Sequence, residues 1–269
     1  MKAEICGKPE TDSEKWVQRE LDDQTINQSR GPGLQPRIQQ LVDSGMTLYQ
    51  PTHSYCLENY PDLQFNSVTT IVDRQFPPFE KERIARYLSE RSTKYKQLSP
   101  DEIIQGWEDT KNHGTAVHKE LDDYVSSDKA PSLPKALSGK ECFDKEIGSY
   151  GDKMFSELIV YSKELKVAGT VDLLTYDSEK NECYIFDWKT SKKIDETYKK
   201  KGITPACHGL GHSKINQYSL QLSMYAFLLE EFHDIKIKGC YIVHLLEDDY
   251  KLIKAEDLRT TVELVLETY

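Results

Sequence analysis

The sequence lacks three features, and each absence excludes a class of protein. No apolar run in its 269 residues is long enough to cross a membrane, and its first residues carry no apolar signal-peptide core. The six cysteines are scattered without a Cys-x-x-Cys pair, which argues against a zinc knuckle or an iron–sulfur cluster. Scattered cysteines are typical of reduced thiols. We therefore expect an intracellular protein without a membrane partner, its compartment left open.

An excess of positive charge is also missing. The formal net charge is -10 at pH 7, with a pI near 5.3. Binding to a nucleic-acid backbone calls for a basic surface, so the overall balance does not favour that partner. Charge is uneven, however, because six lysines and only two acidic residues lie between residues 189 and 201. Such a run is commonly a solvated loop, but this one directly follows the stretch described next.

Composition predicts one folded domain with a polar extension. Hydrophobic residues make up 38% of the chain and charged residues 30%, which is ordinary for a globular domain. Residues 1–45 are largely polar, with weak periodicity and a Gly-Pro-Gly turn. We expect them to be a flexible arm or an arm that orders on a protein partner. Residues 46–269 are predicted to form the domain itself.

Residues 169–190 form the stretch around which the rest is arranged. Two β-branched and aromatic segments flank a polar turn at residues 177–181, a pattern typical of an antiparallel hairpin. Alternation in the second segment places Tyr184, Phe186 and Trp188 on one face. Asp187 and Lys189 lie on the other face, at the end of the strand.

Asp172 from the first segment can join Asp187 and Lys189. Carboxylates beside an ammonium group suit a divalent metal ion and a water molecule activated next to it. The competing interpretation is an exposed ion pair, which is common and contributes little to stability.

The surrounding elements predict a mixed sheet with helices on its faces, either α/β or α+β. A capping box at residues 99–102 opens a long helix, and His118 lies on its apolar stripe as a site residue or as an ordinary core histidine. Glu157 falls within a strand predicted at 155–161. A largely buried helix at 215–231 carries Gln221 and Tyr225 on one face. Residues 126–140 are predicted to be a loop, followed by a helix at 141–153.

Five short elements, taken in order, resemble the RecB-like branch of the PD-(D/E)XK nuclease superfamily. They are Gly114 with His118, the strand glutamate Glu157, Gly169-Thr-Val-Asp172, Asp187-Trp-Lys189-Thr190, and Gln221 with Tyr225. Residues 67–118 also resemble the entry region of mitochondrial genome maintenance exonucleases and related phage and large-virus nucleases. Two features depart from the superfamily pattern. Val171 replaces the proline of the name, and the cysteines of iron–sulfur members are absent.

The resemblance implies a restriction-endonuclease-like core with helical N-terminal additions and metal-dependent hydrolysis of DNA. It implies that His118, Glu157, Asp172, Asp187 and the Trp188 carbonyl hold Mg²⁺ or Mn²⁺, both of which accept oxygen ligands. It also gives Lys189 the task of orienting or deprotonating the attacking water. Substrate contacts are expected from Gln221, Tyr225, Lys192 and Lys193.

Within this chemistry we expect a DNA exonuclease that acts on single strands or ends. A structure-specific endonuclease with the same site remains an alternative, because end selection depends on loops that the motifs do not describe. A catalytically silent nucleic-acid-binding module is the alternative from another class. It predicts damaged acidic or lysine positions, whereas here all of these positions are filled.

Overall fold

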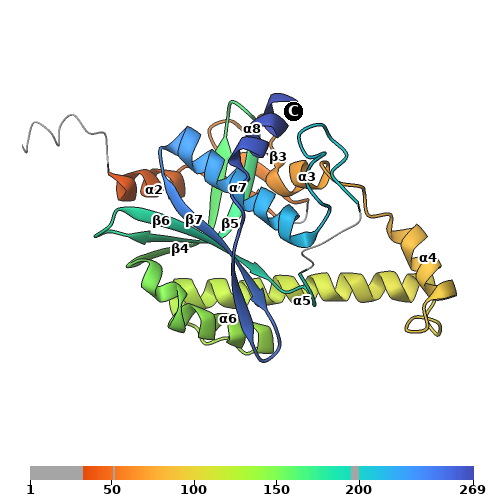
Figure 1. Cartoon of the computed structure of the whole chain (residues 1–269). Helices are drawn as coiled ribbons and strands as arrows, with labels where there is room; N and C mark the ends of the chain where they lie inside the picture. The colour runs from red at the N-terminus through yellow and green to blue at the C-terminus, as the bar shows by residue number, and fades with distance from the viewer. Residues whose placement is uncertain (1–32, 51, 195–199) are drawn as a thin grey trace, which may run out of the picture.

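The computed structural model describes residues 33–50, 52–194 and 200–269, which form one mixed β-sheet with helices on both faces (Figure 1). The sheet strands lie in the order β4 (Lys153–Ser162), β5 (Val167–Asp177), β6 (Glu182–Lys189), β7 (Ile237–Leu245) and β8 (Tyr250–Lys254). Only β6 and β7 among these neighbours are parallel, and the two-residue β3 (Asn66–Ser67) adds a parallel pairing at the start of β5. The predicted α+β class, with a central mixed sheet flanked by helices, is confirmed.

One face of the sheet is covered by α7 (Lys214–His233), the helix that connects the parallel strands β6 and β7. This helix is buried on several sides, as its apolar pattern predicted. Around it pack three shorter helices: α2 (Leu34–Val42), α3 (Val68–Asp73) and α8 (Arg259–Glu267). Their apolar side chains form the larger core of the molecule.

The opposite face is covered by α5 (Pro100–Ser127) and α6 (Pro134–Lys145). The alternation of β6 separates the two cores as predicted. Cys183 and Ile185 belong to the core under α7, whereas Phe186 and Trp188 pack under α5 and α6. The sheet therefore carries two distinct apolar layers, and β6 contributes to both.

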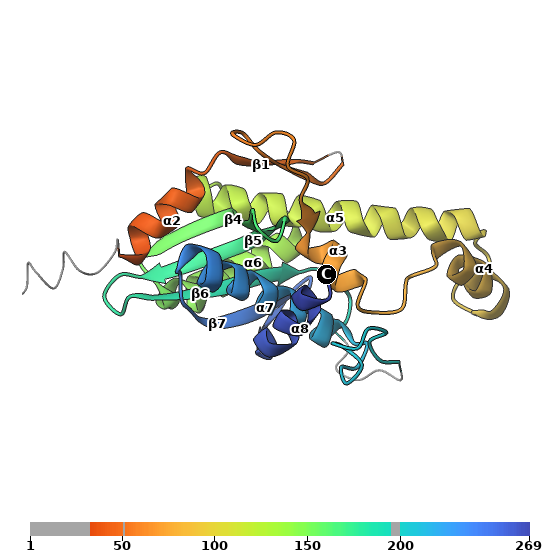
Figure 2. The same cartoon turned by 90° about the horizontal axis from the view of Figure 1, so that it is seen from above.

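The long helix α5 begins with the predicted capping box. The Ser99 side chain accepts from the Glu102 backbone, and the Glu102 carboxylate accepts from Ser99. At 1.5 Å per residue, its 28 residues span about 42 Å. Its first half extends beyond the sheet, where α4 (Lys81–Arg91) lies beside it (Figure 2).

Two segments correct the sequence predictions. Part of the predicted N-terminal arm is the helix α2, whose Leu34, Ile38 and Leu41 are buried in the larger core at helical spacing. Residues 1–32 of that arm lie outside the described residues. The predicted loop at 126–140 is also partly helical, because α6 starts at Pro134. Proline is tolerated at the first helical position, since the backbone N–H that it lacks would have no hydrogen-bond partner within the helix.

A small hairpin lies over the second half of β4 and the start of β5. Its strands, β1 (Met46–Tyr49) and β2 (Ser54–Leu57), pair in antiparallel register. Tyr55 and Leu57 pack with Ala168, and the Tyr55 hydroxyl lies 3.1 Å from that of Thr170. These contacts fix the hairpin as one wall of the cavity described below.

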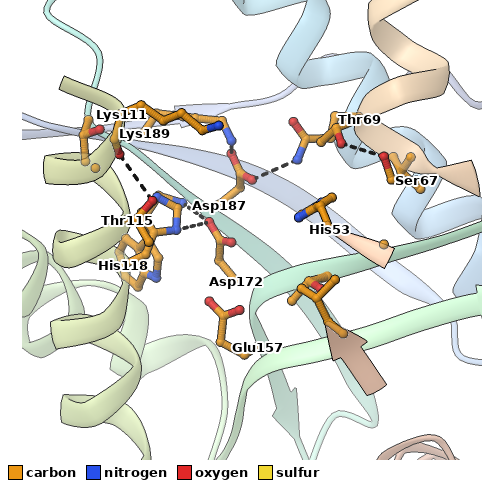
Figure 3. A pocket seen from close by; sticks show the side chains of 18 of the residues that line it. His53, Ser67, Thr69, Lys111, Thr115, His118, Glu157, Asp172, Asp187 and Lys189 are labelled. Carbon is orange, nitrogen blue, oxygen red and sulfur yellow. Dashed lines mark hydrogen bonds and ion pairs between the residues drawn. The ribbon is translucent and has the colours of Figure 1, made fainter. Parts of the chain in front are cut away.

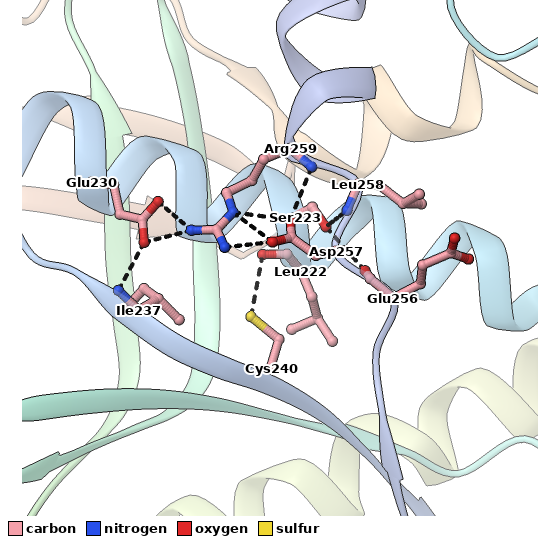
Figure 4. Close-up of polar contacts among 9 residues, drawn as sticks. All are labelled: Leu222, Ser223, Glu230, Ile237, Cys240, Glu256, Asp257, Leu258 and Arg259. Atoms are coloured by element: carbon pink, nitrogen blue, oxygen red, sulfur yellow. Dashed lines mark hydrogen bonds and ion pairs between the residues drawn. The ribbon is translucent and has the colours of Figure 1, made fainter.

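The C-terminal helix is tied to the larger core by charged contacts (Figure 4). Arg259 donates to Glu230 of α7 at 2.7 Å and to the neighbouring Asp257 at 2.9 Å. Glu230 also accepts from the backbone of Ile237 at 2.9 Å, at the start of β7. In the described part of the chain, no helix combines the length and apolarity needed to span a membrane.

Candidate active site

The site forms where β5 and β6 separate. Their last paired residues at this end are Leu173 and Phe186, so Asp172 and Asp187 are the first residues beyond the ladder. The Asp172 carboxylate accepts a hydrogen bond from the Trp188 backbone at 2.8 Å, which fixes it in the gap between the strands. Both carboxylates thus face the same opening (Figure 3).

The ladder between β4 and β5 is interrupted at the same level. Its register runs through Ser156–Leu173 and Leu158–Val171, which places Glu157 opposite Asp172 without a ladder pairing. Glu157 has a φ of 49°, in the left-handed region, where a residue other than glycine costs roughly 1–3 kcal/mol.

Side-chain alternation reverses on both strands at this interruption. Phe155 and Leu158, three residues apart, pack into the same larger core, as do Val171 and Leu174. Strict alternation would place residues three apart on opposite faces. The reversal turns Asp172 and Glu157 together toward the cavity.

His118 completes a group of potential metal ligands. Its Nδ1 lies 3.4 Å from Asp172 Oδ2, and one ligand atom each from His118, Glu157 and Asp172 fall within 4.8 Å of one another. The imidazole lines the cavity and is partly exposed. It is therefore not the ordinary core histidine that the helix pattern left open.

Lys189 and Asp187 form a buried ion pair next to this group. Lys189 Nζ lies 2.6 Å from Asp187 Oδ2, and the two side chains are only 16% and 3% exposed. The ammonium group also lies 4.7 Å from the centre of the Tyr218 ring. Because both side chains are largely buried, this pair is not the exposed surface ion pair that the sequence left open as an alternative.

The predicted pair on α7 reaches the same cluster. Gln221 Nε2 lies 3.4 Å from Asp187 Oδ1 and donates to the Tyr225 hydroxyl at 3.0 Å. Both side chains line the cavity. The half-buried glutamine therefore has the polar partners that its position on an apolar helix requires.

Burial raises the pKa values of two carboxyl groups in the cluster. Loss of hydration, with repulsion from Asp172, raises the pKa of Asp187 to about 6, although Lys189 opposes the shift. The same two causes raise the pKa of Glu157 to about 7. Negative charge is therefore crowded here beyond what the chain's own cations neutralise.

The other three groups favour their charged forms. Burial alone would lower the pKa of His118, but the carboxylate of Asp172 outweighs burial and the pKa is raised. Burial likewise opposes the charged forms of Asp172 and Lys189. Even so, His118 holds the pKa of Asp172 below its ordinary value, and Asp187 holds that of Lys189 above its own.

Glycine at position 169 allows the helices to approach the site. A Cβ atom there would lie 2.5 Å from the Tyr225 ring and 3.0 Å from the Val68 side chain. Contacts this short exclude any larger residue unless α7 or α3 moves away. The glycine that precedes Asp172 by three residues thus sets how closely Tyr225 stands to the carboxylates.

All these groups open into one cavity of about 800 Å³. Its walls come from the β1–β2 hairpin, the start of α3, one side of α5 and one side of α7. Three lysines line it, namely Lys111, Lys119 and Lys189. Lys192 and Lys193, expected to contact substrate, are exposed on the following loop and do not line this cavity. Lys199 lies outside the described residues.

Two contacts that the sequence did not reveal hold the chain just after Lys189. Lys135, at the start of α6, donates to the Thr190 carbonyl at 2.7 Å, and its side chain is only 10% exposed. His244 of β7 contacts the Ser191 carbonyl at 2.6 Å and is also buried. No local motif in the sequence indicates contacts between such distant residues. In the structure, the burial of Lys135, unusual for a lysine, marks the position.

The donor set fits a divalent cation that prefers oxygen ligands. The carboxylates of Glu157 and Asp172 converge with the His118 imidazole, and Asp187 lines the same cavity. Loss of hydration, with repulsion from Asp172, raises the pKa values of Glu157 and Asp187. Oxygen donors suit Mg²⁺, and an added nitrogen donor is well accepted by Mn²⁺.

Comparison with known proteins gives no family assignment. No protein-family model matches the chain, and no curated protein sequence matches it either. Among solved structures it is similar to SSO0001, with 14% identity, coverage of 87% of this chain and 84% of that one, and a TM-score of 0.35. It is also similar to a Eubacterium rectale protein named "Putative exonuclease", with 12% identity, 83% and 84% coverage, and a TM-score of 0.40. At such scores, neither likeness assigns a function.

Proposed function

We propose that this chain is a metal-dependent deoxyribonuclease of the PD-(D/E)XK type, RecB-like branch, and that it acts as an exonuclease on single strands or DNA ends. One observation carries the proposal. The ligand atoms of His118, Glu157 and Asp172 lie within 4.8 Å of one another, in the same cavity as the buried Asp187–Lys189 pair. Perturbed ionisable groups gathered in a cleft are typical of active sites.

In this proposal Asp172, Asp187, Glu157 and His118 would hold Mg²⁺ or Mn²⁺, with the Trp188 carbonyl as a further candidate. The bound ion would act as a Lewis acid on the phosphodiester and favour formation of the nucleophile. Occupation would also favour the ionised forms of Asp187 and Glu157, whose pKa values are raised by burial and by repulsion from Asp172.

In the proposed mechanism, protein side chains orient the attacking water, stabilise the developing charge and hold the reacting groups in position. The Lys189 ammonium, held by Asp187 at 2.6 Å, is positioned to orient the attacking water and to stabilise charge that develops on the phosphoryl oxygens. Gln221 fixes the other oxygen of Asp187, and Tyr225 fixes Gln221. Rigid support of this kind keeps the reacting groups in register.

The shape of the cavity supports a single strand as substrate. A volume of about 800 Å³ is typical of pockets that enclose one small ligand, which leaves room for a few nucleotides of one strand. Lys111 on α5 is suited to hold a phosphate beside the carboxylates, whereas Lys119 already pairs with Asp122 and Asp123. Lys192 and Lys193 would contact the strand outside the cavity.

The test is cleavage of end-labelled single-stranded DNA, linear and circular, with Mg²⁺, Mn²⁺ or chelator. Wild type is compared with Lys189→Ala and with Lys251→Ala, a matched variant at an exposed lysine on β8. We expect metal-dependent loss of linear DNA in wild type and Lys251→Ala. For Lys189→Ala we expect a loss of about 10³-fold or more, since a group that stabilises transition-state charge is removed.

The same assay separates the alternatives. Survival of circular DNA identifies an exonuclease, and its cleavage identifies an endonuclease with the same site. Absence of cleavage in every metal, with DNA still bound, would replace the proposal by a silent binding module. Equal activity of Lys189→Ala and wild type would remove Lys189 from the site.

A further inference from the structure

The segment around α4 is basic, although the chain as a whole is acidic. Residues 79–98, called here the α4 lobe, contain six basic and three acidic side chains within a protein of net charge -10. The basic residues are Lys81, Arg83, Arg86, Arg91, Lys94 and Lys96. The lobe lies at the end of α5 that extends beyond the sheet (Figure 2).

Much of this charge is not used within the protein. Lys81 pairs with Glu108 of α5 and Arg83 pairs with Glu80. In contrast, Arg86, Arg91 and Lys96 are exposed and form no ion pair with any carboxylate in the described ranges. Unpaired basic side chains gathered in one short segment produce a local positive potential that attracts polyanions.

Aromatic side chains accompany these charges. Phe79 and Tyr87 are 61% and 64% exposed, and Lys94 lies 4.9 Å above the Tyr95 ring. Basic residues interleaved with exposed rings form the surface typical of proteins that bind single-stranded nucleic acid, because bases stack on the rings while lysines and arginines contact phosphates.

The lobe is continuous with the proposed active site. The Phe79 ring meets the Trp107 ring edge to face, with centroids 5.2 Å apart, and Trp107 itself lines the cavity. Trp107 and His118 both lie on α5, so they are about 16 Å apart along the helix axis. That length corresponds to about five nucleotides at the spacing of one strand in a duplex.

We propose that the α4 lobe and Trp107 bind the single-stranded polynucleotide that leads into the cavity, with Trp107 and Phe79 stacking on bases and the exposed arginines and lysines holding phosphates. The inference rests on the proposed nuclease function. It assigns the longer part of the substrate to a surface about five nucleotides away from the carboxylates. A basic lobe could also hold an acidic protein, but its connection to the cavity through Trp107 favours the polynucleotide.

The test measures binding without cleavage, by fluorescence anisotropy of labelled oligothymidylate in chelator. Wild type is compared with Arg86→Gln/Lys94→Gln/Lys96→Gln. The matched control is Lys180→Gln/Lys238→Gln/Lys254→Gln, three exposed lysines toward the other end of the sheet. If each of the three lobe side chains holds one phosphate, the salt dependence of log K should weaken in the lobe variant by about 2 units of slope. The control should keep the wild-type slope.

Oligomer length provides a second readout. A strand of roughly four nucleotides is too short to reach both the carboxylates and the lobe, whereas one of about twenty reaches both. The lobe variant should therefore lose affinity for the long oligomer only. Oligouridylate of the same length should behave like oligothymidylate if stacking and phosphate contacts dominate, and a blunt duplex should bind weakly.

Trp107 is tested separately, because its ring also packs against Phe79. Trp107→Ala should weaken binding of the long strand about 5- to 100-fold, as expected when a base loses its stacking partner. Trp107→Phe keeps an aromatic ring and should restore most of the affinity. An equal loss in both variants, with a lowered melting temperature, would assign Trp107 a purely structural role.

The outcomes separate the two proposals. Unchanged affinity and salt slope in the lobe variant would overturn the inference even if wild type cleaves DNA. Equal binding of duplex and single strand would also overturn it. Conversely, binding that depends on the lobe, with no cleavage in Mg²⁺ or Mn²⁺, would leave the inference standing and remove the nuclease function on which it was built.

Discussion

The two ends of the β5–β6 hairpin each carry an aspartate–lysine pair at the same distance. At the turn, Lys180 Nζ lies 2.6 Å from Asp177 Oδ2, and at the open end Lys189 Nζ lies 2.6 Å from Asp187 Oδ2. The surroundings differ. The lysine is 64% exposed at the turn and 16% exposed at the open end.

The pKa values of the two aspartates consequently move in opposite directions. Hydrogen bonds from the Lys180 ammonium and backbone lower the pKa of Asp177. Loss of hydration and the nearby Asp172 raise the pKa of Asp187 to about 6, although its own lysine is equally close. Burial among like charges therefore distinguishes the cavity cluster from a surface ion pair, and the distance between partners does not.

Metal addition should produce the largest difference in thermal stability between variants at the two ends of the hairpin. At an ion concentration of about 100 times Kd, binding to the folded state alone stabilises wild type by about 2.7 kcal/mol. Asp172→Asn should lose most of this gain, whereas Asp177→Asn should keep it. Thermal unfolding with and without Mn²⁺ measures both. An equal gain in the two variants would mean that the ion binds elsewhere.

Removing the Lys135 side chain should change the stability and the activity of the open end more modestly. At the turn, Asp177 itself accepts the backbone hydrogen bonds of Glu179 and Lys180, whereas Thr190 relies on distant Lys135. Lys135→Met leaves the Thr190 carbonyl without this donor, at a cost of about 1–3 kcal/mol. We expect kcat to fall about tenfold with KM nearly unchanged, because Lys189 loses its anchoring neighbour.

Lys251→Met, an exposed lysine on β8, serves as the control for that substitution and should leave both quantities unchanged. A loss of stability with unaltered kcat in Lys135→Met would restrict Lys135 to a structural role.

The smallest expected effect is on the pH dependence of stability without metal. In the folded protein Glu157 has a pKa of about 7, against an ordinary value of 4.5. Its contribution to the free energy of unfolding is therefore fully present below pH 4.5 and is lost as pH rises through 7. Glu157→Gln should therefore stabilise the metal-free protein near pH 8 by about 1–2 kcal/mol, allowing for partial exposure, and by little near pH 5.

Urea unfolding in chelator at both pH values measures this difference. The pKa of Asp177 is lowered, so this residue gives the opposite dependence of stability on pH. Its contribution to the free energy of unfolding is present above its ordinary pKa and is lost in acid. A Glu157→Gln effect of equal size at both pH values would contradict the assignment.

Elements with strong periodicity could be predicted from the sequence. Hydrophobic alternation placed the β5–β6 hairpin and separated Phe186 and Trp188 from Cys183 and Ile185, as the two cores confirm. Helical spacing likewise placed Gln221 and Tyr225 on one face of α7. Such patterns are visible because neighbouring residues determine them.

Features set by distant contacts could not be predicted. The reversal of faces at Glu157 depends on a left-handed backbone conformation that glutamate does not favour by itself. The contact between Lys135 and Thr190 joins separate elements. The α4 lobe differs from both, because its six basic side chains are visible in the sequence, although the lysines after Lys189 form the denser run.

The missing ladder pair between Glu157 and Asp172 also marks a boundary between two parts of the sheet. On one side, the first half of β4 pairs with the end of β5, which continues into β6, β7 and β8. On the other side, the second half of β4 pairs with the start of β5 and carries β3 and the β1–β2 hairpin. Cooperative opening units in proteins tend to follow such boundaries. An ion or a phosphate held at Asp172 and Glu157 would bridge these two parts of the sheet at the position where the ladder pair is missing.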